Sequence, residues 1–410
     1  MTATTGLVTK TVEGIRAEFP ALARREAGRL VAFFDAPGGT QVPECVIAAM
    51  ADYLRHHNAN THWNYPTSAE TDGLIADARQ AVADFLNATP DEVVFGPNMT
   101  TLTFHLARGL ARRWDAGDEV VVTELDHHGN VGPWEAVAAD HGLTLRRIPF
   151  RTSNGTLDLD RVIDAIGRRT RLVAIAAASN ALGTVTDVTA ICAMASHRGA
   201  LSFVDAVHSA PHILPDVQAI GCDYLACSPY KFYGPHHGVL WGRKTLLEEV
   251  PVPKLRPAPD TAPERLETGT QSHEAIVGTR AAIDFLAAIA PRESRRASLV
   301  AAYQVLRDRS QRIFSRLWDG VGAITSARRF GPPPDQRRTP TLGFVLNGVP
   351  SSQVARRLGS RGLYLSHGDF YAATVVERLG LGEEGLVRAG AACYTTEEEV
   401  DRLLEALPEP

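Results

Sequence analysis

Lys231 lies in a segment with few charges, in which residues 227 to 235 read CSPYKFYGP. A lysine among mostly uncharged neighbours is a candidate for a lowered pKa, and a neutral amine can condense with an aldehyde. Upstream, a strand-like stretch ends at Asp205, whose carboxylate could hold a pyridine nitrogen protonated. The pair points to a site for pyridoxal 5'-phosphate, although a lysine taken alone would more often be a solvated one after a strand.

Other candidate cofactor residues also follow predicted strands. Met99, Thr100 and Thr101 begin a helix, whose free N–H groups and hydroxyls could bind phosphate, although threonine could simply cap the helix. His127 offers a flat ring that could stack on an aromatic cofactor, and a loop histidine satisfied by its neighbours is the alternative. Asn180 could donate a hydrogen bond to a phenolate oxygen. Each signal is weak singly, but one cofactor accounts for all of them, together with three more polar residues after the last strands: His208, Ser228 and Tyr230.

The elements that must position these residues alternate between strand-like and helix-like patterns. Short apolar runs predict buried strands at 92–95, 119–123, 143–148, 172–178, 201–204 and 224–227. Helical periodicity separates them at 43–56, 71–87, 100–113, 134–141, 159–166 and 190–198. This alternation predicts an α/β fold with a doubly wound, mostly parallel sheet, in which ligands gather at the carboxyl ends of the strands.

The pattern changes after a proline-rich connection at 251–263. A long helical stretch follows at 276–317, interrupted near Pro291, and then come further elements: strands at 342–346 and 385–389 and helices at 352–358 and 397–407. This second pattern predicts a smaller α+β domain. We therefore expect a large cofactor-binding domain over residues 31–284 and a small domain formed by residues 1–30 and 285–410.

The composition excludes several classes of function. A net charge of -5 gives no electrostatic reason to expect nucleic acid or an anionic membrane as a partner. No apolar stretch is long enough to span a bilayer, and the first residues lack the pattern of a secretory signal. The five cysteines are scattered, so a disulfide framework or a cysteine zinc site is not supported, and a reducing cytoplasm is the expected compartment. The pairs His127–His128 and His236–His237 do not suggest a metal, because adjacent residues of an extended chain point to opposite sides.

Over nearly its whole length the chain resembles the class V aminotransferase family of fold type I pyridoxal-phosphate enzymes, and more narrowly the cysteine desulfurase branch. The segments that carry the resemblance occur in the family's order: 60–62, 100–101, 126–134 (DHHGNVGPW), 179–184 (SNALGT), 205–208 (DAVH), 223–235 and 267–270 (ETGT).

The resemblance implies a role for each candidate residue. Lys231 would form the Schiff base with pyridoxal 5'-phosphate, Asp205 would pair with the ring nitrogen, and His127 would stack on the ring. The other implied contacts are Asn180 and His208 at the phenolic oxygen, Met99, Thr100, Thr101, Ser228 and Tyr230 at the phosphate, Gly38 in the wall of the substrate pocket, and Arg388 at the carboxylate of a small amino-acid substrate. Thr270 would reach the phosphate of a neighbouring subunit, which implies a homodimer.

One departure from the family bears on the reaction. The family's catalytic cysteine lies on a loop that corresponds to residues 365–373 (LSHGDFYAA), which contain no cysteine. Tyr371 stands near the expected position, and Ser366 replaces an arginine. We therefore expect β-elimination of the C–S lyase type rather than a persulfide mechanism, which needs a thiolate there. The alternatives are a cysteine desulfurase that uses a non-standard cysteine, an epimerase, aldolase or decarboxylase of the same family, and a cofactor-binding partner or sensor without turnover.

Overall fold

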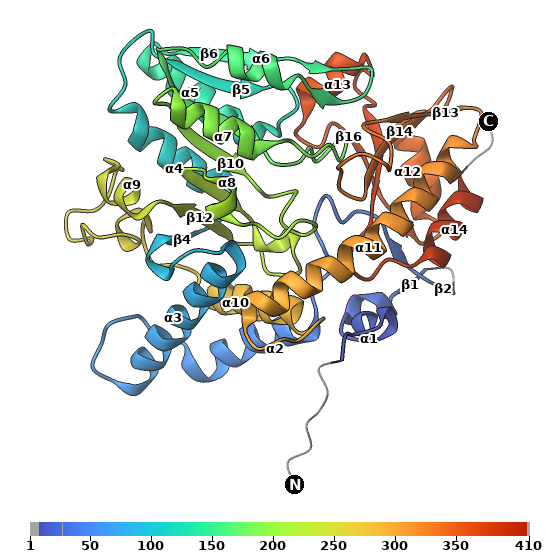
Figure 1. The fold of residues 1–410 in the computed structure, drawn as a ribbon. Helices are drawn as coiled ribbons and strands as arrows, with labels where there is room; N and C mark the ends of the chain where they lie inside the picture. The colour runs from blue at the N-terminus through green and yellow to red at the C-terminus, as the bar shows by residue number, and fades with distance from the viewer. Residues whose placement is uncertain (1–7, 27, 408–410) are drawn as a thin grey trace.

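The computed structural model describes residues 8–26 and 28–407 (Figure 1). Its centre is a seven-stranded sheet in the order β4-β12-β11-β10-β9-β5-β6. Strand β12 runs in the direction opposite to the other strands of this sheet. The strand bounds are β4 Val93–Gly96, β5 Glu119–Thr123, β6 Thr144–Ile148, β9 Thr170–Ala176, β10 Leu201–Asp205, β11 Tyr224–Cys227 and β12 Gly238–Gly242.

Helices cover both faces of this sheet, because its central strands are apolar on both sides. Along β5, Val121 packs into the core on one face, while Val120 and Val122 pack into the core on the other. The first face is covered by α3 (Pro66–Leu86), α6 (Leu159–Asp164), α7 (Val188–His197) and α10 (His273–Ala287). The second is covered by α4 (Met99–Ala111) and α5 (Gly132–His141). The predicted doubly wound α/β sheet is confirmed.

The C-terminal part contains a four-stranded antiparallel sheet in the order β13-β14-β17-β16. Its elements are β13 Ala327–Phe330, β14 Thr341–Leu346, α12 Ser351–Gly359, β15 Leu363–Tyr364, β16 Ser366–Gly368, α13 Ala373–Leu379, β17 Leu386–Gly390 and α14 Glu397–Ala406. β3 (Ala32–Phe33) pairs in parallel with β15, so this early strand lies with the C-terminal elements. The sequence predicted the α+β character, but it did not predict β16 and α13, which flank the loop without a cysteine.

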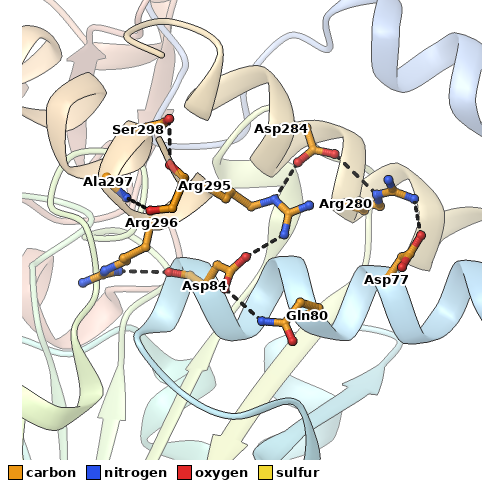
Figure 2. A network of polar contacts seen from close by, with 10 residues as sticks. Asp77, Gln80, Asp84, Arg280, Asp284, Arg295, Arg296, Ala297 and Ser298 are labelled. Atoms are coloured by element: carbon orange, nitrogen blue, oxygen red, sulfur yellow. Dashed lines mark hydrogen bonds and ion pairs between the residues drawn. The ribbon is translucent and has the colours of Figure 1, made fainter. Parts of the chain in front are cut away.

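One long helix packs against the cores of both parts. The predicted helical stretch is in fact two helices, α10 and α11 (Arg295–Gly322), separated around Pro291. The first half of α11 packs on the large core through Leu299 and Leu306, and the second half packs on the small core through Ile313 and Leu317. Figure 2 shows the start of α11, where Arg295 Nη1 meets Asp84 Oδ2 of α3 at 2.6 Å and Arg295 Nε meets Asp284 Oδ1 of α10 at 2.8 Å.

Two smaller features complete the description. The helix predicted from Pro43 is α2 (Glu44–Asp52), which continues into a single π turn at Tyr53–His57. Among the residues described, no helix is both long enough and apolar enough to cross a bilayer. The predicted domain boundaries stay a prediction.

Candidate active site

Lys231 ends a short 3-10 turn (Pro229–Lys231) that follows β11. Its Nζ donates hydrogen bonds to the carbonyl oxygens of Pro37 at 2.6 Å and Gly38 at 2.9 Å. Burial, and then the positive charge of Arg388, lowers the pKa of Lys231 to about 7, while Asp205 opposes the shift. The side chain therefore offers a neutral amine near neutral pH, as a condensation with an aldehyde requires.

Asp205 is the last residue of β10 and is buried. Its Oδ1 accepts a hydrogen bond from the Val207 N–H at 2.9 Å. Burial raises the pKa of Asp205 to about 6, and the Val207 N–H and Lys231 oppose that shift. The carboxyl group is thus mostly ionised at pH 7, and it can keep a nearby cationic nitrogen protonated.

His127 and Asn180 follow the neighbouring strands β5 and β9. His127 Nδ1 accepts from the Gly129 N–H at 2.8 Å, and burial, followed by the charges of Lys231 and His128, lowers the pKa of this ring to about 4. The ring is therefore neutral and suited to stacking. Asn180 Nδ2 donates to the Phe370 carbonyl at 2.9 Å, but its buried Oδ1 has no partner in the described part of the chain. A buried acceptor without a hydrogen-bond partner indicates a place where a ligand group can bind.

The start of α4 forms the anion-binding corner of the site. Asn98 caps the helix by accepting from the Thr101 N–H at 2.8 Å, and the Met99 N–H donates to Ser228 Oγ at 3.2 Å. Gly129 brings the His127 turn close, because a Cβ there would lie 2.9 Å from Thr100 Oγ1. Helix N–H groups and two hydroxyls therefore converge near His127, as a phosphate requires.

Three other predicted residues have different surroundings. Tyr230 stacks on His236 with ring centroids 4.9 Å apart, and Lys231 Nζ lies 5.0 Å from the Tyr230 ring. His208 is buried, and its Nε2 lies 3.1 Å from the hydroxyls of both Thr339 and Thr341, which orient the ring from the smaller part of the chain. Thr270 is exposed, and no side-chain hydrogen bond between described residues joins it to the cluster.

Arg388 comes from β17 and is buried beside Gly38. Its Nη1 donates to the Asn180 carbonyl at 3.1 Å and its Nη2 to Ser366 Oγ at 3.3 Å. Nε is buried and has no partner among the residues described. A Cβ at Gly38 would lie 3.4 Å from Nη2, so this glycine leaves room at the Nε–Nη2 edge. A free guanidinium edge of this kind fits a carboxylate.

Sequence reasoning missed two carboxyl groups near the cluster, of which Asp126 is buried and Asp35 is half-buried. Asp126 accepts from the Ala176 N–H at 3.0 Å and from Asn130 Nδ2 at 3.3 Å, and so fixes the turn that carries His127. Burial raises the pKa of Asp126 to about 7. Asp35 has a buried Oδ1 without a partner in the described chain, and burial raises its pKa. The signal was present, because each acid lies within three residues of a predicted site residue.

The loop after β16 lies against the site. The Phe370 ring lies 3.9 Å from the Arg388 guanidinium carbon, and the Tyr371 carbonyl accepts from the His128 N–H at 2.7 Å. None of the five cysteines lies in this loop. Cys45 is exposed and the other four are buried, and burial raises the pKa of all five thiols.

Comparison with known proteins identifies the class. The Aminotransferase class-V family profile matches residues 32–403, and the chain belongs to this family. It is 33% identical over 419 residues to a cysteine desulfurase of Klebsiella pneumoniae (strain 342), with 98% of each chain covered. It is 32% identical to a probable cysteine desulfurase of Pseudomonas putida, with 96% of each covered.

Solved structures agree with this assignment. The apo cysteine desulfurase of Thermococcus onnurineus NA1 matches with a TM-score of 0.87 and 26% identity over 97% of each chain. The cysteine desulfurase CsdA of Escherichia coli matches with a TM-score of 0.85 and 26% identity, over 97% of this chain and 98% of that one. The protein is therefore a pyridoxal-phosphate-dependent enzyme with the fold type I architecture, as the resemblance implied. The predictions of fold, enzyme and cofactor are confirmed.

Proposed function

We propose that the enzyme breaks the carbon–sulfur bond of cysteine or a closely similar small amino acid. The observation that carries the proposal is the position of Gly38 between Lys231 and Arg388. Its carbonyl accepts from Lys231 Nζ at 2.9 Å, and its missing side chain leaves 3.4 Å to Arg388 Nη2. The lysine that would carry the cofactor and a carboxylate-binding arginine thus flank one residue, which matches the close spacing of the two polar groups of an α-amino acid.

In this proposal the chain supplies binding and proton transfer. Bound pyridoxal phosphate supplies an electron sink for the carbon that bears the substrate amine. Asp205 would hold the ring nitrogen protonated, and His127 would lie against the ring as a neutral imidazole. The start of α4, with Ser228, would hold the phosphate. Lys231, whose pKa is about 7, can take up and return a proton at the substrate carbon.

The fate of the sulfur separates two forms of the reaction. Similarity to proteins named as cysteine desulfurases favours a cysteine desulfurase over the C–S lyase expected from the sequence. A desulfurase would leave alanine and place the sulfur on a protein thiol, for which Cys45 is the exposed candidate among the described cysteines. The lyase stays a second candidate, because the other four thiols are buried and the loop at 365–373 contains no cysteine. Its products from cysteine would be sulfide, pyruvate and ammonia.

Product analysis with L-cysteine tests both forms. The holoenzyme, Cys45→Ser and the buried-site control Cys222→Ser are incubated with L-cysteine, and alanine, pyruvate, sulfide and protein persulfide are measured. A desulfurase gives alanine with a persulfide that is lost in Cys45→Ser and kept in Cys222→Ser. A lyase gives pyruvate and sulfide in all three proteins. If no sulfur leaves the substrate, the proposed function is wrong.

We also propose a homodimer in which Thr270 reaches the neighbouring site. Thr270 is exposed, and so is an apolar group around the π turn: Ile47, Leu54, Trp63 and Tyr65. These exposed apolar side chains lie within one short stretch of the sequence, and contiguous apolar surface of this kind supports association. Sedimentation of the wild type should give a dimer, and Trp63→Glu should shift it toward a monomer. Leu255→Glu, at a side chain that is 62% exposed, serves as the matched control.

A further inference from the structure

The side chain of Phe370 covers one face of the Arg388 guanidinium. The distance from the Phe370 ring centre to the guanidinium carbon is 3.9 Å, and Arg388 is buried. A guanidinium over an aromatic ring is attracted to the ring's negative face, and the attraction is stronger when water is excluded. Phe370 therefore fixes the plane of the group that faces Gly38.

The backbone around Phe370 adopts this position at a conformational cost. Phe370 and Tyr371 have φ values of 56° and 57°, in the left-handed region that L side chains rarely adopt. Three hydrogen bonds hold the strained turn. The Tyr371 N–H donates to Asp369 Oδ1 at 2.9 Å, the Phe370 carbonyl accepts from Asn180 Nδ2 at 2.9 Å, and the Tyr371 carbonyl accepts from the His128 N–H at 2.7 Å.

The hydrogen bonds of Arg388 leave one edge of the group free. Nη1 is engaged by the Asn180 carbonyl at 3.1 Å. On the other edge Nε has no partner in the described structure, and Nη2 makes only a 3.3 Å contact with Ser366 Oγ. With one face under Phe370 and one edge occupied, the Nε–Nη2 edge beside Gly38 is the part that can receive a carboxylate in two parallel hydrogen bonds.

We propose that Phe370 is a positioning residue that holds Arg388 for the carboxylate of the substrate. The proposal rests on the proposed function only in that Arg388 binds that carboxylate. Phe370 also connects substrate binding to the loop, because its backbone carbonyl accepts a hydrogen bond from Asn180. A bound carboxylate fixes Arg388, Arg388 fixes the Phe370 ring, and the ring keeps the loop closed over the site.

The experiment compares an amino acid with the corresponding amine. Phe370→Leu removes the aromatic face, Phe370→Tyr restores it, and Phe330→Leu makes the same change at a buried phenylalanine that lies 4.7 Å from Arg328. Each holoenzyme is titrated with L-alanine and with ethylamine, and binding is followed by the absorbance of the cofactor. Phe370→Leu should weaken L-alanine binding about tenfold and leave ethylamine unchanged, while Phe370→Tyr and Phe330→Leu should bind both like the wild type.

A second readout does not depend on cofactor chemistry. Hydrogen exchange of residues 369–374 should slow when L-alanine binds the wild type and should not slow in Phe370→Leu. Equal weakening of both ligands in Phe370→Leu, or no weakening of either, would overturn the positioning role. Because neither probe contains sulfur, these results are independent of carbon–sulfur cleavage, whose failure would show only in the L-cysteine products.

Discussion

Lys231 and Asn180 each follow a strand of the seven-stranded sheet and Asp205 ends one, whereas Phe370 and Tyr371 lie in a short connection between β16 and α13. The first group is placed by a regular element, because parallel strands end together at one edge of a sheet. The second group is placed by its left-handed backbone and by hydrogen bonds from Asn180 of the first group and from His128. The sheet therefore positions the residues that would bind the cofactor, and the loop contributes two aromatic residues from another part of the chain.

The two regions also differ in the electrostatic state of their side chains. Near the strand ends, burial moves the pKa of Lys231 down to about 7 and the pKa of Asp205 up to about 6. The loop contributes two uncharged aromatic rings and no thiol. The comparison suggests that the strand ends carry the proton chemistry and that the loop governs which substrate reaches it. Four experiments test this division.

Replacing Lys231 with alanine should have the largest effect. Turnover should fall by about a thousandfold or more, because the amine both anchors the cofactor and moves the proton. Borohydride reduction followed by peptide mapping of the wild type should place the cofactor on Lys231. Lys244→Ala, at an exposed lysine paired with Asp91 at 2.6 Å, should keep full activity. Label on another lysine would refute the assignment.

Asp205→Asn should lower turnover by about a hundredfold while the cofactor stays attached to Lys231, because a neutral amide cannot hold the ring nitrogen protonated. Cofactor absorbance and steady-state kinetics measure the two effects separately. Asp126→Asn is the matched comparison, since Asp126 has a pKa of about 7 and loses less negative charge. Equal losses in both variants would show that Asp205 has no special role.

The pH dependence of cofactor uptake should be next in size. Only the neutral form of Lys231 can condense with the aldehyde of pyridoxal phosphate. As the pH is raised toward 7, the rate of recombination with apoprotein should therefore increase about tenfold per pH unit, and above pH 7 it should level off. Arg388→Gln removes a positive charge that lowers this pKa, so the midpoint should move to higher pH. Stopped-flow absorbance measures the rate, with a simple lysine amide as the reference. A midpoint near pH 10 would contradict a buried, neutralised amine.

The contrast between the two regions also explains what could be predicted from the sequence. The apolar runs that end at Asp205 and Cys227 are local patterns, and the parallel sheet then brings their ends together without further information. The left-handed pair at Phe370 and Tyr371 has no local signal, because neither residue type favours that conformation. It depends on partners about 190 and 240 positions away in the chain, such as Asn180 and His128.

The same reasoning applies to the candidates beyond the strand ends. Arg388 could be named because the resemblance to the family implied a carboxylate-binding arginine there, but nothing in the sequence indicated that the Phe370 ring lies against it. His208 was expected to face the cofactor, and its bonds to Thr339 and Thr341 come from a separate part of the chain. The sequence also gave no indication of the π turn at Tyr53–His57, whose single extra residue has no marker in the helical periodicity.

The smallest change is Asp369→Ala, which tests the loop alone. It removes the acceptor for the Tyr371 N–H, a 2.9 Å bond in a strained turn, so stability should fall by about 1 kcal/mol. Exchange of the loop amides should quicken several-fold, whereas turnover should change less than threefold because no strand-end residue is altered. Asp369→Asn keeps a side-chain oxygen at the same place and should resemble the wild type. A hundredfold loss of turnover in Asp369→Ala would mean that the loop takes part in the chemistry itself, and the division between strand ends and loop would not hold.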